Sequence, residues 1–288
     1  MEISLSSNGA LIFAHNNASM DYVKLAIFAA ERVKRFLKVP VSIATDSKAY
    51  LLKTFPDHPF DQIIDITPEI STAQQKKFHD GTMAFTLGEW KNLSRFRAYD
   101  ITPYDRTLVL DSDYILNSNV LASAFEVDAP FQIYKKSFDL AGWRDVSSFQ
   151  RINQYSIPFY WATVFVFDKT TITQAFFDLV LYIKSNWLYF RVLYGIEPTN
   201  FRNDFAFSIA IHLMNGKMSG DFATELPGTM TYILDRDICL KIEDTSVQFL
   251  VEKKDHLGEY LAAKTKGLDV HIMNKASLSR IIDGGYGV

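Results

Sequence analysis

Two aspartates, Asp111 and Asp113, stand one residue apart at the end of a run of β-forming residues, in the segment TLVLDSDYIL. In an extended segment, residues i and i+2 point to the same side, so the two carboxylates project together while Ser112 faces elsewhere. Neighbouring carboxylates repel each other unless a cation lies between them. Because hard divalent cations prefer such oxygen ligands, the pattern predicts a metal site at the end of a buried strand. A capping aspartate beside a solvated one is the alternative interpretation.

The first half of the chain contains several short apolar runs that end in polar residues, and the aspartate pair ends one of them. Strands are predicted at residues 10–17, 39–47, 60–67 and 107–116. Helical patterns separate the runs, which predicts an α/β fold with a mostly parallel central sheet and helices on both faces. Ligands of such sheets bind at the carboxyl ends of the strands, so we expect the polar residues there to share one rim.

Two helices are predicted between these strands. Ser19 is a candidate cap for the first. The second covers residues 87–101 and is stopped by Pro103. Lys91 and Arg95 are four residues apart in it and would share a face. The second half is less regular, with strands predicted at 129–138, 159–168 and 268–274, helices at 171–193 and 203–216, and a small hairpin formed by 229–235 and 247–252.

Composition narrows the class of protein. The chain has 288 residues, of which 48% are hydrophobic and 22% charged, so a large core can form, and the net charge of −3 gives no sign of nucleic-acid or membrane binding. Cys239 is the single cysteine, which gives no support for secretion. The N-terminus lacks the pattern of a signal peptide, and the apolar segment 175–195 contains charged residues that favour a buried helix. We therefore expect a cytoplasmic protein without stable membrane insertion.

Residues 90–116, WKNLSRFRAYDITPYDRTLVLDSDYIL, resemble the centre of metal-dependent GT-A glycosyltransferases, especially the family-8-like group. These enzymes carry a basic helix, a Tyr-Asp pair before a turn, and a hydrophobic run into the aspartate pair. The resemblance follows the order of elements from Asn8 to Asp168. It implies one Rossmann-like GT-A domain over residues 1–288, with a nucleotide-sugar-binding half (1–117) and an acceptor-side half (118–288). The implied reaction moves a sugar from a nucleotide-diphosphate sugar, expected to be a UDP-sugar, to a hydroxyl acceptor.

The resemblance also implies roles for single residues. Asp111 and Asp113 would hold Mn²⁺ or Mg²⁺, which binds the donor diphosphate. His271, in VHIMNKASL, would complete the metal site and Lys275 would contact the diphosphate, although the glycine usual between them is replaced. Two carboxylates with an imidazole favour Mn²⁺. The residues implied to bind the donor are Ala14, Asn16, Asn17, Tyr22, Asp46, Lys91, Arg95, Ser112 and Lys275.

On the acceptor side, Asn203 and Asp204 begin a predicted helix. In the resembling family an acidic residue here lies beside the reacting sugar carbon, so Asp204, with Asn203 next to it, is the candidate catalytic group. Capping of the helix is the alternative. Inversion at the sugar carbon would need a base such as Asp204, whereas retention would not.

The acceptor stays open, with a cell-surface glycan, a protein and DNA as candidates. The compact chain is also similar to bacteriophage enzymes that transfer glucosyl or arabinosyl groups to hydroxymethylcytosine in DNA, which would act in the host cytoplasm. That possibility predicts a basic groove beside the aspartates and aromatic side chains around a flipped base. The residues named for it are Lys135, Lys136, Arg144, Arg151, Trp143, Tyr160 and Trp161.

Two other classes compete with a glycosyltransferase. The segment LVLDSDYI also fits phosphatases of the haloacid-dehalogenase type, whose first aspartate is a nucleophile, but that motif normally opens the domain and three predicted strands precede it here. The other class is a nucleotide-sugar-binding module without turnover. Protection from thermal unfolding by Mn²⁺ and a uridine diphosphate, without hydrolysis or transfer, would favour the module.

Overall fold

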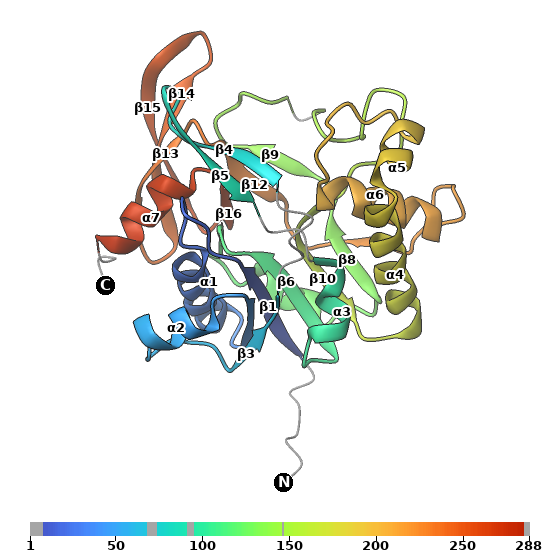
Figure 1. The fold of residues 1–288 in the computed structure, drawn as a ribbon. Helices are drawn as coiled ribbons and strands as arrows, with labels where there is room; N and C mark the ends of the chain where they lie inside the picture. The colour runs from blue at the N-terminus through green and yellow to red at the C-terminus, as the bar shows by residue number, and fades with distance from the viewer. Residues whose placement is uncertain (1–7, 68–73, 91–94, 146, 285–288) are drawn as a thin grey trace.

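The computed structural model describes residues 8–67, 74–90, 95–145 and 147–284. Within these ranges the centre of the molecule is a seven-stranded sheet (Figure 1). In order across the sheet, its strands are β11 (Thr224–Glu225), β8 (Phe131–Tyr134), β10 (Trp161–Asp168), β6 (Arg106–Asp111), β1 (Asn8–Ala14), β2 (Val41–Thr45) and β3 (Gln62–Asp65). The ladder is parallel except that β10 runs against both of its neighbours. The predicted mostly parallel α/β sheet is therefore confirmed.

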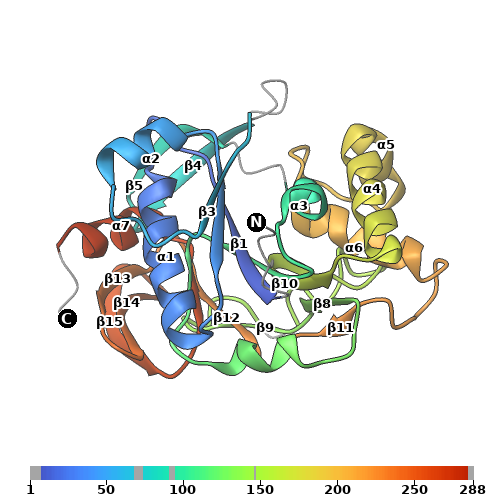
Figure 2. The same ribbon diagram turned by 90° about the horizontal axis from the view of Figure 1, so that it is seen from below.

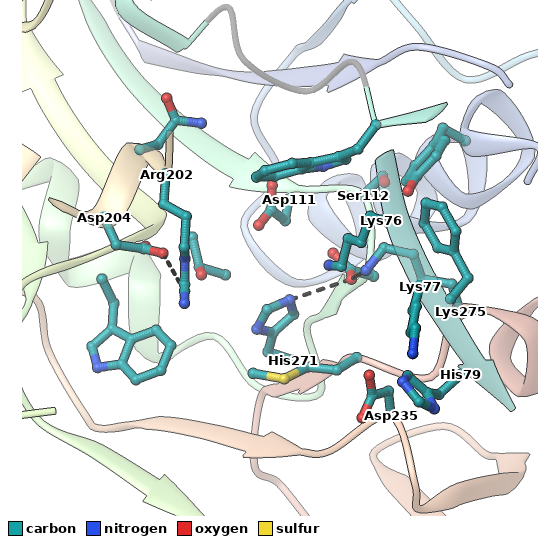
Figure 3. A pocket seen from close by; sticks show the side chains of 18 of the residues that line it. Lys76, Lys77, His79, Asp111, Ser112, Arg202, Asp204, Asp235, His271 and Lys275 are labelled. Atoms are coloured by element: carbon teal, nitrogen blue, oxygen red, sulfur yellow. Dashed lines mark hydrogen bonds and ion pairs between the residues drawn. The ribbon is translucent and has the colours of Figure 1, made fainter. Parts of the chain in front are cut away.

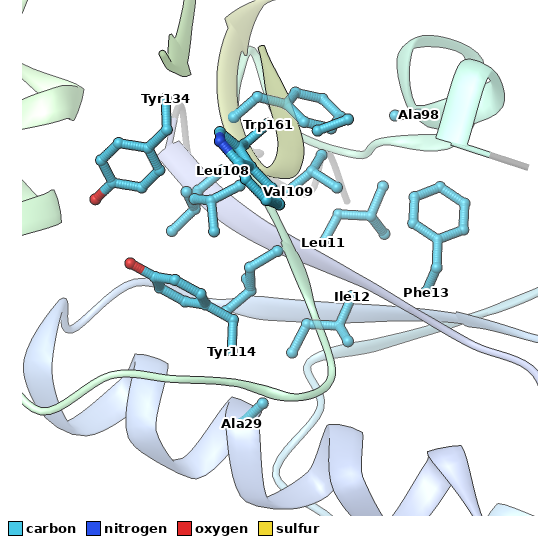
Figure 4. Packing of buried hydrophobic residues seen from close by; sticks show 14 of the residues in the cluster. Leu11, Ile12, Phe13, Ala29, Ala98, Leu108, Val109, Tyr114, Tyr134 and Trp161 are labelled. Atoms are coloured by element: carbon cyan, nitrogen blue, oxygen red, sulfur yellow. The ribbon is translucent and has the colours of Figure 1, made fainter. Parts of the chain in front are cut away.

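Helices cover both faces of this sheet (Figure 2). Successive residues of β1 point to opposite sides, so Ile12 is directed toward Ala29 of α1 (Tyr22–Phe36), whereas Phe13 lies on the side of Ala98 in α3 (Ala98–Ile101) (Figure 4). β1, β2 and β6 are almost wholly buried, as expected for strands covered on both faces. The other helical segments are α2 (Lys48–Thr54), α4 (Thr171–Ser185), α5 (Trp187–Leu193), α6 (Asn203–Met214), α7 (Lys275–Asp283) and the 3₁₀ turns η2 (Arg95–Arg97) and η3 (Val120–Phe125).

A second, four-stranded sheet ties the end of the chain to the aspartate pair. Its strands are, in order, β7 (Tyr114–Ile115), β16 (Val270–Ile272), β12 (Met230–Ile233) and β9 (Ser137–Asp139). β16 pairs antiparallel with β7, which places His271 opposite Tyr114. The backbone N–H of Ile272 also donates to the carbonyl of Asp113 at 2.9 Å. A late segment of the sequence therefore lies directly beside the aspartates.

The remaining strands form a three-stranded sheet of β13 (Ile238–Ile242), β14 (Ser246–Lys253) and β15 (His256–Lys266), and a hairpin of β4 (Gln74–Asp80) and β5 (Ala84–Trp90). The hairpin predicted from 229–235 and 247–252 is wrong, because β12 and β14 belong to different sheets. The strand predicted at 129–138 is divided between β8 and β9.

The helix predicted over residues 87–101 is also wrong in its first part. Residues up to Trp90 form β5, and a helix begins at Ala98 after η2, while residues 91–94 lie outside the described ranges. Pairing with β4 overrides the local pattern, and Gly88 allows a close approach at which a Cβ atom would lie 2.7 Å from Ser19 Oγ. The first helix begins after Asp21, whose side chain accepts from the N–H of Lys24, rather than after Ser19.

Asp269 secures the second sheet just before His271. Its Oδ1 accepts from the N–H groups of Asn117 and Ser118 at 2.7 and 2.9 Å, while its buried Oδ2 has no hydrogen-bond partner within the described ranges. Burial raises the pKa of this carboxyl to about 6, against the lowering effect of these hydrogen bonds. Since the pKa is higher in the folded than in the unfolded chain, its contribution to stability is present below about pH 4 and is lost as the pH rises through about 6.

We therefore expect Asp269→Asn to be more stable than the wild type at pH 7.5 by roughly 1–3 kcal/mol, and to lose most of that advantage at pH 4.5. The amide keeps an acceptor for the two N–H groups and removes the buried charge. Denaturant unfolding of both proteins at the two pH values measures the effect. An equal difference at both pH values would contradict it.

Within the described part of the chain, no helix is long and apolar enough to cross a membrane.

Candidate functional site

The carboxyl ends of the parallel strands and the beginning of β10 meet at one edge of the main sheet. β1 ends at Ala14, β2 at Thr45 and β6 at Asp111, and the opposed β10 begins there with Trp161. A cleft of about 410 Å³ opens at this edge and is lined by residues of β6, β10, the β4–β5 hairpin, β16 and the first turns of α6 and α7 (Figure 3). The rim expected from the strand ends is therefore present in the fold.

Asp111, Asp113 and His271 come together in this cleft. Each offers one ligand atom, and these atoms lie within 4.8 Å of one another. His271 Nε2 is 3.3 Å from Asp113 Oδ2, and both side chains are buried. Two carboxylate oxygens and one imidazole nitrogen form a donor set that suits a divalent cation, and imidazole favours Mn²⁺ over Mg²⁺. The residues present therefore fit the metal that the sequence pattern predicts.

Two basic side chains neutralise the carboxylates. Arg95 forms an ion pair with Asp111, and Lys275 Nζ lies 2.5 Å from Asp113 Oδ2. Burial acts to raise the pKa of Asp113, but Lys275 and His271 outweigh it and hold that pKa well below its ordinary value. Burial lowers the pKa of Arg95 to about 10, so its guanidinium stays charged. The repulsion expected between the two aspartates is therefore relieved from both sides.

Lys275 is held at the beginning of α7 by the residue before it. Asn274 is fully buried, its Oδ1 accepts from the N–H of Ser277 at 2.9 Å, and its Nδ2 donates to the carbonyl of Asp237 at 2.8 Å. Asn274 thus caps the helix and also ties it to the loop before β13. This anchoring directs the Lys275 ammonium into the cleft beside Asp113 (Figure 3).

Tyr22 and Ser112 also line the cleft. Burial raises the pKa of Tyr22 to about 12, with Lys275 acting in the opposite direction and Asp113 in the same one. Its hydroxyl is buried and has no hydrogen-bond partner in the described structure. Tyr22 therefore lies close to Lys275 and Asp113, where a bound ligand can form a hydrogen bond with its hydroxyl.

Asp204 lines the opposite part of the cleft. Its Oδ1 accepts from the N–H of Ala162 at 2.9 Å and its Oδ2 lies 2.7 Å from Arg202 Nη2, while Asn203 is buried next to it. The cap position of α6 is Arg202, and Asn203 and Asp204 lie inside the helix, so the capping alternative is wrong for both residues. The catalytic role of Asp204 and Asn203 stays a prediction.

Four residues expected at the donor do not line the cleft, namely Ala14, Asn16, Asn17 and Asp46. Asn16 Oδ1 accepts from the N–H of Val23 at 2.9 Å, and Asn17 Nδ2 donates to the carbonyl of Glu89 at 2.5 Å. Both asparagines therefore organise the turn into α1 and its contact with the hairpin. Asp46 lies 3.6 Å from His15 Nδ1 at the adjoining strand ends, and Lys91 lies outside the described residues.

The residues named for a DNA groove are dispersed. Arg144 and Trp161 line the cleft. Lys136 pairs with Glu225 at 3.1 Å, and the indole N–H of Trp143 donates to the carbonyl of Glu252 at 2.9 Å. Among the basic residues named for the groove, Arg144 is the one that lines the cleft, and the groove itself stays a prediction.

Two hairpin residues of the cleft wall, Lys76 and Phe78, were missed because the sequence of residues 68–86 shows no strand pattern that links them to the aspartates, and Trp90 was predicted in a helix. The pKa of Lys76 is lowered to about 8, because protein atoms surround its amine and Lys275 lies nearby. Its side chain is nevertheless exposed within the cleft, so solvent limits this shift and Lys76 retains substantial positive charge at neutral pH.

No protein-family model and no curated protein match the chain. Among solved structures, the glycosyltransferase GlyE of Streptococcus pneumoniae TIGR4 is 12% identical over 77% of this chain and 45% of its own, with a TM-score of 0.41. The galactosyltransferase LgtC, in complex with donor and acceptor sugar analogs, is 14% identical over 75% of this chain and 72% of its own, with a TM-score of 0.47. Mouse xyloside xylosyltransferase 1 is 12% identical over 77% of this chain and 85% of its own, with a TM-score of 0.45. The chain thus spans less than half of GlyE.

Proposed function

We propose that the protein is a glycosyltransferase that moves a sugar from a nucleotide-diphosphate sugar, a UDP-sugar in our expectation, to a hydroxyl acceptor. The observation that carries this proposal is the grouping of Asp111, Asp113 and His271 beside Lys275 in one cleft at the carboxyl edge of the parallel sheet. Parallel α/β sheets bind nucleotides at this edge. A cleft with a candidate metal group and a buried lysine suits a diphosphate.

Asp111, Asp113 and His271 would hold the divalent cation, Mn²⁺ by preference. When bound, it supplies positive charge that stabilises the diphosphate as the bond to the sugar breaks. Lys275 adds a second positive charge from the first turn of α7, where Asn274 fixes its direction. The Tyr22 hydroxyl is free to donate to a phosphate or ribose oxygen.

The acceptor side of the cleft is the part lined by Arg202, Asp204 and Trp161. Arg202 and the Ala162 N–H hold the Asp204 carboxylate in place, so it can accept hydrogen bonds from sugar hydroxyls or take the proton of an attacking hydroxyl. Trp161 is almost completely buried and offers an apolar wall for a sugar ring.

Nucleotide release measures the proposed reaction directly. Purified protein with Mn²⁺ is given UDP-glucose, UDP-galactose, UDP-arabinose, GDP-sugars and CDP-sugars. We expect release of uridine diphosphate from at least one UDP-sugar, and loss of that release when a chelator removes the metal. Release that survives the chelator would contradict the metal assignment, whereas protection from unfolding without release would favour a binding module. Hydroxymethylcytosine DNA, a glycan and a protein, added in turn, then test for the acceptor by an increased rate.

A further inference from the structure

The β4–β5 hairpin forms one wall of the cleft and is fixed to the body of the protein at several points. Asp80 pairs with Arg280 of α7 at 2.6 Å, and the N–H of Gly81 donates to the carbonyl of Asp235 at 3.3 Å. At the other end of the hairpin, the Asn17 amide holds the carbonyl of Glu89. The hairpin therefore presents its cleft-lining side chains in a defined position.

Lys76 is one of two lysines by which this wall lines the cleft, and like Lys77 it forms no ion pair within the described ranges. Its Nζ lies 5.3 Å from the centre of the Trp90 ring and 5.9 Å from that of Phe78. These two aromatic side chains, one on each strand of the hairpin, orient the amine by packing and cation–π attraction. Figure 3 shows Lys76 in the part of the cleft that holds Ser112 and Lys275.

The charges around Lys76 leave it without a carboxylate partner. Three other cations of the cleft are paired, Arg95 with Asp111, Lys275 with Asp113 and Arg202 with Asp204. Lys76 forms no ion pair with any carboxylate in the described ranges. It also has Lys275 and Arg202 as cationic neighbours, both of which disfavour its charge. Asp113 and Asp235 act in the opposite direction without forming an ion pair with Lys76, so its ammonium remains open to an anionic ligand.

We propose that Lys76 is a phosphate-binding residue of this cleft, which donates charge-assisted hydrogen bonds to the diphosphate of the donor from the hairpin side. The identity of the substrate rests on the proposed function, whereas the choice of an anionic ligand rests on the unpaired ammonium of Lys76 in the cleft. Lys275 and Lys76 reach the cleft from two different elements, α7 and β4, so together they grip a diphosphate between them. Negative charge on the diphosphate grows as it leaves the sugar, so Lys76 aids departure as well as binding.

Calorimetric titration in the presence of Mn²⁺ tests this role with three probes: uridine diphosphate, inorganic diphosphate and uridine. We expect Lys76→Gln to weaken both diphosphates roughly 10- to 100-fold and to leave uridine unchanged. Lys76→Arg should keep most of the affinity. Lys241→Gln is the matched control, because Lys241 is exposed on β13 and pairs with Glu243 away from the cleft, and it should bind all three probes as the wild type does. Lys76 is exposed, so the variants should unfold at the wild-type temperature.

The outcomes separate this proposal from the proposed function. If no nucleotide-sugar is turned over but inorganic diphosphate binding depends on Lys76, the glycosyltransferase assignment fails and the phosphate site stands. If donors are turned over and Lys76→Gln binds both diphosphates like the wild type, the role of Lys76 is wrong and the function stands. Absence of diphosphate binding by the wild type would overturn the role of Lys76 as well.

Discussion

Asp113→Asn is expected to lower metal-dependent nucleotide release by about 1,000-fold or more, equivalent to about 4 kcal/mol of transition-state stabilisation. Asp113 is the carboxylate that contacts both His271 and Lys275, so it links the metal group to the basic group. The amide has the same shape but lacks the charge that binds the cation. Titration with Mn²⁺ should show a parallel loss of metal affinity, which is a measurement independent of turnover.

The matched control is Asp283→Asn, an equal change at an exposed carboxylate that pairs with Lys24 at 2.7 Å. This variant should keep wild-type release and metal affinity. Thermal unfolding of both variants shows whether the fold is retained. Wild-type activity and Mn²⁺ affinity in Asp113→Asn would overturn the metal assignment.

Lys275→Met is expected to destabilise the protein by roughly 3–5 kcal/mol in the absence of metal, because removal of the ammonium leaves the buried Asp113 carboxylate with His271 as its remaining partner. Asp113 and Lys275 are both almost inaccessible to solvent, with side chains 3% and 13% exposed. For a chain of this size, the unfolding temperature should fall by roughly 10 °C. Added Mn²⁺ should recover part of the loss, since a cation bound by Asp113 replaces the missing ammonium.

The double variant Asp113→Asn with Lys275→Met separates stability from function. Removing both charges leaves no unpaired ion, so the double variant should be more stable than Lys275→Met alone while remaining inactive. Unfolding of the wild type, both single variants and the double variant completes the cycle. A Lys275→Met protein as stable as the wild type without metal would show that the ion pair does not stabilise the fold.

Much of the framework could be predicted from residues 10–67 and 107–116. Their apolar runs end in polar residues, and this local alternation predicted β1, β2, β3 and β6 and the parallel sheet. The spacing of Asp111 and Asp113 also predicted that their carboxylates would act together. These features depend on residues that are close in the chain, so they can be predicted from the local pattern of apolar and polar side chains.

Other parts of the prediction failed where a distant partner decided the structure. Residues 87–90 have a helix-compatible pattern, but their pairing with β4 makes them a strand. Asn16 and Asn17 were predicted to hold the donor, but they do not line the cleft and use their amides to form the turn into α1. In each case the contact that decides the conformation or the role depends on how separate elements pack.

The sequence predicted that two carboxylates act together at the end of a buried strand in a mostly parallel sheet, because apolar periodicity is a local property. The predicted extended segment is wrong, since Ser112 and Asp113 form a turn after β6 and Ser112 lines the cleft with both aspartates. The resemblance to a known family implied His271 and Lys275 as neighbours, but only the tertiary structure brings them to the aspartates. The pairing of β16 with β7 places His271 and Lys275 beside Asp113, and the hairpin brings Lys76 into the same part of the cleft. Such neighbours depend on the register between strands that are distant in the chain, which the spacing of residues within any one segment does not specify.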